Sequence, residues 1–125
     1  MAQFDVTLLL ITHNLSLVAE LCDHSVVIYR GHTVEEADTS ALFARPLHPY
    51  TRGLLASVLT FQTPRGQLRP IGGSVPNPRE KISGCQFRPR CPHVMSICAA
   101  APPPFQVIEP GHPCACFLTH AKEDP

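Results

Sequence analysis

The sequence predicts an α/β fold for residues 1–60, followed by a mostly irregular extension rich in proline and cysteine over residues 61–125. Apolar runs of strand and helix length alternate through the first part. Only two of the 14 prolines precede residue 63, whereas five of the six cysteines follow it. The extension has few aliphatic residues, so we expect a covalent or metal crosslink to hold it rather than a core of its own.

Residues 6–12 (VTLLLIT) are a continuous apolar and β-branched run. Continuous rather than alternating apolarity predicts a strand buried on both faces, as in a parallel sheet. Asn14 is suited to cap a helix. At helical spacing it is followed by Leu15, Leu17, Val18 and Leu21.

A second strand is expected over residues 26–29. Gly31 is suited to a tight turn that leads into a return strand over residues 32–35. A short helix capped by Thr39 or Ser40 is then expected to end before Pro46.

Pro49 is suited to the first turn of a further helix. Its buried stripe is expected to comprise Leu54, Leu55, Val58 and Leu59. Two strands buried on both faces require neighbours that this sequence does not supply. We therefore expect the chain to be the C-terminal part of a larger α/β domain.

The charge of the chain is divided between its two parts. Six acidic and three basic side chains give residues 1–62 a net charge of −3, and seven basic and four acidic side chains give residues 63–125 a net charge of +3. The total is zero, which argues against nucleic acid as a partner. The longest apolar run is too short to span a bilayer, and no basic segment precedes it as in a secretory signal.

Three segments resemble a known family. Residues 8–20 (LLLITHNLSLVAE) resemble the switch-histidine segment of ABC-transporter ATPase subunits, and residues 31–36 resemble the strand that follows it. Residues 46–55 (PLHPYTRGLL) resemble the His-Pro-Tyr-Thr block of the oligopeptide/dipeptide importer subfamily, which also contains nickel importers. The resemblance covers residues 5–120. It implies that residues 1–60 are the C-terminal part of a P-loop NTPase (ABC ATPase) domain, and that residues 61–125 are this subfamily's C-terminal extension with its cysteine motif.

His13 is the candidate catalytic residue. It ends a predicted buried strand, and ligands of open α/β sheets bind beyond the carboxyl ends of strands. An imidazole there can donate a hydrogen bond to a phosphate oxygen, or it can simply be a polar residue that closes a strand. The resemblance implies that His13 is the switch histidine that faces the nucleotide γ-phosphate.

No phosphate-binding loop of the form G-x-x-x-x-G-K-[ST] occurs in the sequence. The family's signature block and catalytic acidic residue are absent too, so we expect the chain alone to be inactive as an ATPase. The resemblance implies ATP and magnesium as cofactors of the full-length subunit. It also implies as partners a second ABC ATPase subunit and transmembrane permease subunits, with peripheral attachment at the cytoplasmic face of the membrane.

The five cysteines of the extension are Cys85, Cys91, Cys98, Cys114 and Cys116. Disulfides, zinc and an iron–sulfur cluster are competing interpretations of this spacing. The extension resembles the C-terminal cysteine motif of dipeptide/oligopeptide importer ATPases, some of which carry a [4Fe-4S] cluster. By position, that resemblance implies Cys85, Cys91, Cys98 and Cys116 as metal ligands, with Cys114 as a possible substitute for Cys116.

Three further interpretations concern individual residues or pairs of residues. His48 and Tyr50 are expected to pack or hydrogen-bond at a helix start, and Cys22 to be a small buried hydrophobe. Arg88 and Arg90 flank the cysteines, where they either stabilise an anionic cluster or are simply solvated.

The predicted function is therefore part of the ATP-binding subunit of an ABC importer, which couples ATP hydrolysis to transport of oligopeptides, dipeptides or nickel. The alternative is a non-enzymatic iron–sulfur or metal-binding module, and a third hypothesis is a remnant without function.

Overall fold

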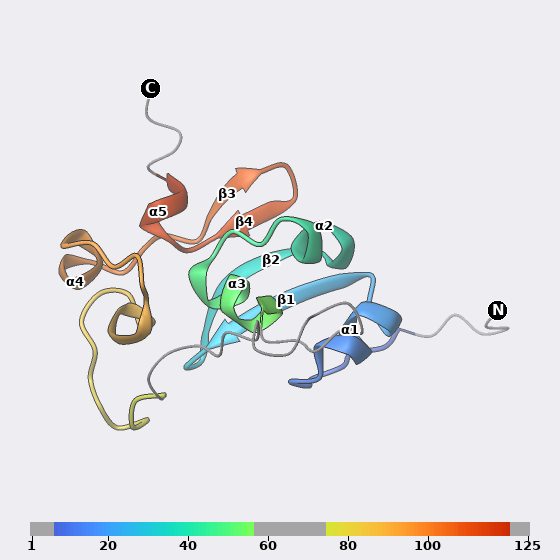
Figure 1. The fold of residues 1–125 in the computed structure, drawn as a ribbon, viewed down its shortest axis with the longest axis horizontal. Coiled ribbons are helices and arrows are strands. Elements are labelled where there is room, and N and C mark those ends of the chain that lie inside the picture. The colour runs from blue at the N-terminus through green and yellow to red at the C-terminus, as the bar shows by residue number, and fades with distance from the viewer. Residues whose placement is uncertain (1–6, 57–74, 121–125) are drawn as a thin grey trace, which may run out of the picture.

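A computed structural model of the chain describes residues 7–56 and 75–120, and Figure 1 shows its arrangement. Within these ranges four strands form one sheet in the order β1-β2-β4-β3, with every neighbouring pair antiparallel. The strands are β1 (His24–Tyr29), β2 (His32–Asp38), β3 (Gln106–Glu109) and β4 (His112–Cys114). The pairing of β2 with β4 joins the first part of the chain to the last.

The β1–β2 hairpin confirms the strands predicted over residues 26–29 and 32–35, although both are longer than expected. Arg30 and Gly31 form its turn with φ of 49° and 78°. Positive φ at both central residues characterises a type I′ turn, whose twist matches that of the strands on either side. Gly31 adopts this conformation without strain, as the sequence suggested.

Helix α1 (Leu15–Leu21) begins where it was predicted, because the side chain of Asn14 accepts a hydrogen bond from the backbone N–H of Leu17 at 3.2 Å. Helix α3 (Pro49–Ala56) begins at the predicted proline. Two residues of its expected stripe, Val58 and Leu59, lie outside the described residues.

Helix α2 (Thr39–Ala44) ends before Pro46 as expected, but the expected cap is wrong. The N-cap is Asp38, and its side chain makes no capping hydrogen bond. The Thr39 hydroxyl is instead 2.7 Å from the Ser25 hydroxyl on β1. That contact ties the start of the helix to the hairpin.

The buried parallel strand predicted over residues 6–12 is wrong for the part that the structure describes. Residues 7–12 have no regular secondary structure, and Leu9 and Ile11 are 84% and 89% exposed. A continuous apolar run forms a buried strand only between other strands, and no described strand pairs with this segment. The mixed fold is therefore built on an antiparallel sheet rather than the expected parallel one.

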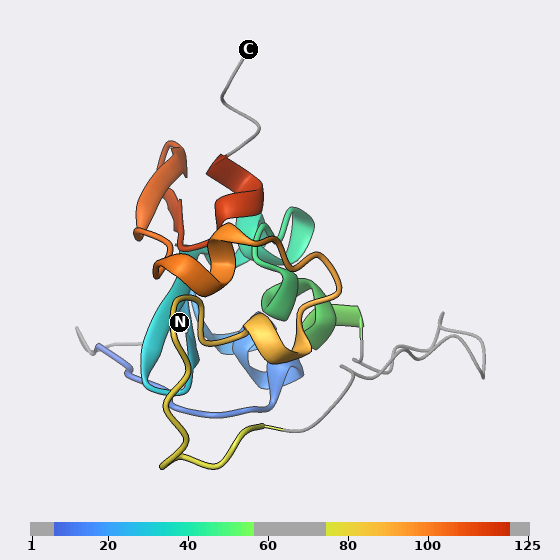
Figure 2. The same cartoon turned by 90° about the vertical axis from the view of Figure 1, so that its left-hand side faces the viewer.

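The extension wraps around one end of the hairpin. Figure 2 shows α2 and α3 on one side of the sheet, with the segment from residue 75 onward curling round its end. Arg30, in the hairpin turn, fixes this segment by donating to Gln86 Oε1 at 2.8 Å and to the carbonyls of Asn77 and Glu80 at 3.0 and 2.8 Å. The domain boundary expected near residue 60 lies outside the described residues.

The extension also contributes to the core. Phe87 is 2% exposed and packs against Tyr29 and Tyr50, with ring centroids 5.2 and 5.4 Å apart. Its short helices are η1 (Arg88–Arg90), α4 (Ile97–Ala100) and α5 (Phe117–His120). Within the described ranges, no helix is long and apolar enough to cross a bilayer.

Candidate functional site

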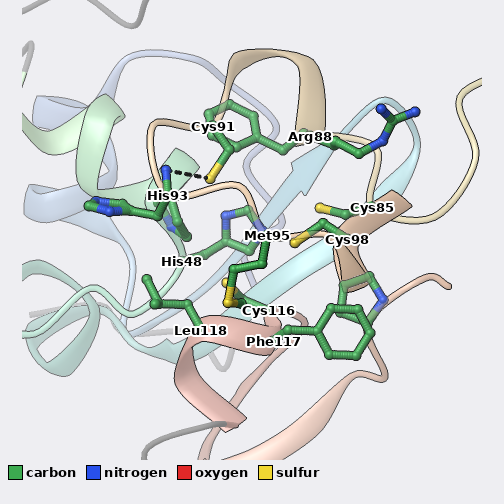
Figure 3. A pocket seen from close by; sticks show the side chains of 13 residues that line it. His48, Cys85, Arg88, Cys91, His93, Met95, Cys98, Cys116, Phe117 and Leu118 are labelled. Carbon is green, nitrogen blue, oxygen red and sulfur yellow. Dashed lines mark hydrogen bonds between the residues drawn. The ribbon is translucent and has the colours of Figure 1, made fainter. Parts of the chain in front are cut away.

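Four cysteines line one cavity, here called the cysteine cavity, which Figure 3 shows from close by. Cys85 and Cys91 lie before and after η1, Cys98 lies in α4, and Cys116 directly precedes α5. The structure thus brings together the four residues that the resemblance implied as ligands, although they are spread over 32 positions of sequence.

Backbone N–H groups donate hydrogen bonds within and between the loops that carry the first three cysteines. The Cys85 N–H donates to the Cys98 carbonyl at 2.7 Å, and the His93 N–H donates to Cys91 Sγ at 3.4 Å. Gly84, with φ of 71°, passes so close to Cys98 that a side chain there would overlap the Cys98 carbonyl oxygen. Cys85 and Cys91 also pack on the core around Phe87.

Burial determines the protonation of these side chains. It raises the pKa of the Cys85, Cys91 and Cys116 thiols, although backbone N–H groups oppose the shift at each. The free thiols are therefore protonated at neutral pH, and a bound metal would have to displace their protons. In the described part of the chain, no three His, Cys, Asp or Glu side chains lie close enough together to hold one metal ion.

Cys114 is separate from the cysteine cavity. It lies directly opposite Glu35 in the β2–β4 pairing and is fully buried there. Burial and the nearby Glu35 raise its pKa strongly. Because Cys116 lines the cavity and Cys114 does not, the geometry favours Cys116 as the fourth member of the set.

His48, the residue that directly precedes α3, also lines the cysteine cavity. Its Nδ1 accepts a hydrogen bond from the Tyr50 N–H at 3.0 Å, which confirms the structural role expected at a helix start. Burial, reinforced by Arg52, lowers the pKa of His48 to about 4, so the ring is neutral at pH 7. No sequence pattern indicated that this histidine would lie among the cysteines.

Glu35 is a buried residue that the sequence analysis missed. Its carboxylate accepts hydrogen bonds from the backbone N–H groups of Leu47 and His48, both at 2.8 Å. His112 Nε2 lies 2.5 Å from the same carboxylate. One side chain thus connects β2, the segment before α3 and β4. A glutamate in a strand is ordinarily solvent-exposed, so no local pattern identifies this role.

The two flanking arginines differ in their contacts. Arg88 lines the cysteine cavity and donates to the Ser83 carbonyl and hydroxyl at 3.3 and 3.4 Å. Arg90 instead donates to the Tyr29 hydroxyl at 3.4 Å and lies 6.0 Å from the centroid of its ring. Of these two arginines, Arg88 is the one that lines the cavity, and its charge opposes the rise in the pKa of Cys85.

His13 lies outside the cysteine cavity. It is exposed, precedes the Asn14 cap of α1, and lines a second cavity among α1, β1 and α3. The Asn14 N–H donates to Thr12 Oγ1 at 3.0 Å, a local hydrogen bond between the two residues that flank His13. Cys22, at the C-terminal end of α1, is half-buried rather than buried.

The chain is similar to one family of known proteins, the peptide-transport ATP-binding proteins. Residues 34–98 match the family described as "Oligopeptide/dipeptide transporter, C-terminal region". The chain is 42% identical over 116 residues to the oligopeptide transport ATP-binding protein AppD of Bacillus subtilis, covering 93% of this chain and 35% of that protein. It is 40% identical over 115 residues to the oligopeptide transport ATP-binding protein OppD of Salmonella typhimurium, covering 92% and 34%.

The dipeptide transport ATP-binding protein DppD of Caldanaerobacter subterraneus is 39% identical over 113 residues, covering 90% of this chain and 35% of that protein. The chain thus spans about a third of the length of the curated relatives it matches. The family match includes Glu35, His48 and three of the cavity cysteines, whereas Cys116 lies beyond it.

Proposed function

The chain belongs to the family of oligopeptide/dipeptide transporter C-terminal regions, and we propose on this basis that it forms part of the ATP-binding subunit of an importer for short peptides. The observation that carries the proposal is the match over residues 34–98, which includes the His-Pro-Tyr-Thr block. The matched relatives are named as oligopeptide or dipeptide transport ATP-binding proteins. These names favour a transport subunit over a separate, non-enzymatic metal-binding module.

In this proposal, ATP and magnesium are bound with polypeptide outside the present sequence, because the sequence contains no phosphate-binding loop. A second ATPase subunit and membrane-embedded permease subunits would be the partners, at the cytoplasmic face of the membrane. His13 would donate a hydrogen bond to the γ-phosphate and position the attacking water. Its position before the Asn14 cap of α1 and its exposure are compatible with that role.

The proposal is tested by uptake of a labelled short peptide into cells whose own gene carries His13→Ala. Loss of a group that positions the reaction is expected to lower uptake by about 100-fold or more, with the amount of protein unchanged. His32→Ala is the matched control, because His32 is likewise exposed but lies in the hairpin. Uptake that is equal in the two strains would refute the role of His13, and wild-type uptake in a strain that lacks the gene would refute the transport function itself.

We also propose that Cys85, Cys91, Cys98 and Cys116 hold a [4Fe-4S] cluster. The four cysteines line one cavity, and four thiolates are the ligand set that such a cluster takes. When bound, the cluster would supply a structural crosslink for the extension. Iron and sulfide analysis of anaerobically prepared protein tests this assignment.

A further inference from the structure

His48 stands out among the residues of the cysteine cavity that are not cysteines. Its side chain is 1% exposed, and Figure 3 shows its ring among the cysteine side chains. Arg88 also lines the cavity, but its guanidinium donates to Ser83. His93 lies at the exposed rim, where its backbone rather than its ring contacts Cys91.

The hydrogen bonds of His48 determine where its ring proton lies. The Tyr50 backbone N–H can only donate, so Nδ1 of His48 must accept and cannot carry a proton. The ring hydrogen is therefore on Nε2. The His48 N–H donates to Glu35 Oε1, and the ring meets Phe87 in an edge-to-face contact with centroids 5.8 Å apart. These contacts hold both the backbone and the ring plane of His48.

We infer that the Nε2–H group of His48 donates a hydrogen bond to a sulfur of the group held in the cysteine cavity. This inference rests on the proposed cluster. Four thiolates give such a cluster a net negative charge, and a hydrogen bond to sulfur makes it easier to reduce. The buried histidine of the His-Pro-Tyr-Thr block thus acts as a positioning residue that tunes the cluster electrostatically. It is not itself a ligand.

The test compares the wild-type chain with His48→Phe, His48→Gln and His93→Ala after anaerobic reconstitution with iron and sulfide. We expect His48→Phe to bind the same amount of iron but to have a lower reduction potential. His48→Gln, which keeps an N–H donor, is expected to recover part of the shift. His93→Ala, which changes a rim histidine of the same cavity, is expected to match the wild type.

A second measurement does not depend on the folding of any variant. Nitrogen-15 NMR of the wild-type chain is expected to show a protonated Nε2 on His48, with a resonance that moves when the cluster is bound. A protonated Nδ1, an unmoved resonance, or an equal potential in His48→Phe would overturn the inference while the cysteine site stands. A wild-type chain that binds no iron would overturn the cluster proposal, and this inference with it.

Discussion

Replacing Glu35 with alanine is expected to lower the free energy of unfolding by about 3–5 kcal/mol, the range observed when one partner of a buried polar pair is removed. The Glu35 side chain is fully buried. Its loss leaves the N–H groups of Leu47 and His48 and the ring of His112 without their shared acceptor. Each buried donor left unpaired costs about 1–3 kcal/mol.

Urea denaturation at neutral pH measures this effect, and two variants serve as controls. Glu35→Gln keeps one acceptor oxygen and is expected to lose less stability than Glu35→Ala. Glu36→Ala alters the neighbouring residue, which contacts the exposed His24 at 2.8 Å. A surface pair of this kind is worth about 1 kcal/mol or less. Equal losses in Glu35→Ala and Glu36→Ala would show that Glu35 does not connect the two parts of the chain.

Gly84→Ala is expected to be the second strongly destabilising substitution, with a loss of about 2–4 kcal/mol. A Cβ atom at this position would overlap the Cys98 carbonyl oxygen and lie 2.9 Å from its carbonyl carbon. That carbonyl accepts the hydrogen bond from Cys85. The two cysteine loops would therefore have to separate, and a φ of 71° adds left-handed strain.

Gly111→Ala is the matched control for the close approach. Gly111 has the same φ of 71°, but a Cβ atom there would meet nothing within 4 Å. It should cost only the left-handed strain, about 1–2 kcal/mol. The difference between the two glycine variants in urea denaturation isolates the contact with Cys98. If both variants lose the same stability, the approach of Gly84 to Cys98 is not as tight as the structure has it.

The local elements were predictable from the sequence because their determinants are local. Asn14 capped the helix that it was expected to cap, Gly31 formed the hairpin turn, and Pro49 began α3. The structure of residues 6–12 was not predictable in this way, because a continuous apolar run indicates only that the segment tends to be buried. The run itself does not specify what it packs against.

The contacts between the two parts of the chain had no signal in the sequence. Glu35 and His112 are 77 residues apart, and their pairing follows from the register of β2 and β4. That register also distinguishes Cys116, which the resemblance implied as a ligand, from Cys114, its possible substitute. Cys114 is still in the strand and lies opposite Glu35, whereas Cys116 follows the strand and reaches the cavity.

Two separate segments of the extension, residues 85–98 and Cys116 before α5, contribute to one cysteine cavity, with Cys116 rather than Cys114 as its fourth cysteine. The most direct test is the iron content of the full chain after anaerobic reconstitution, compared among the wild type, Cys114→Ser and Cys116→Ser. We expect Cys114→Ser to bind as much iron as the wild type and Cys116→Ser to lose most of it. Iron binding that survives in Cys116→Ser and fails in Cys114→Ser, or that is absent from all three, would contradict the account.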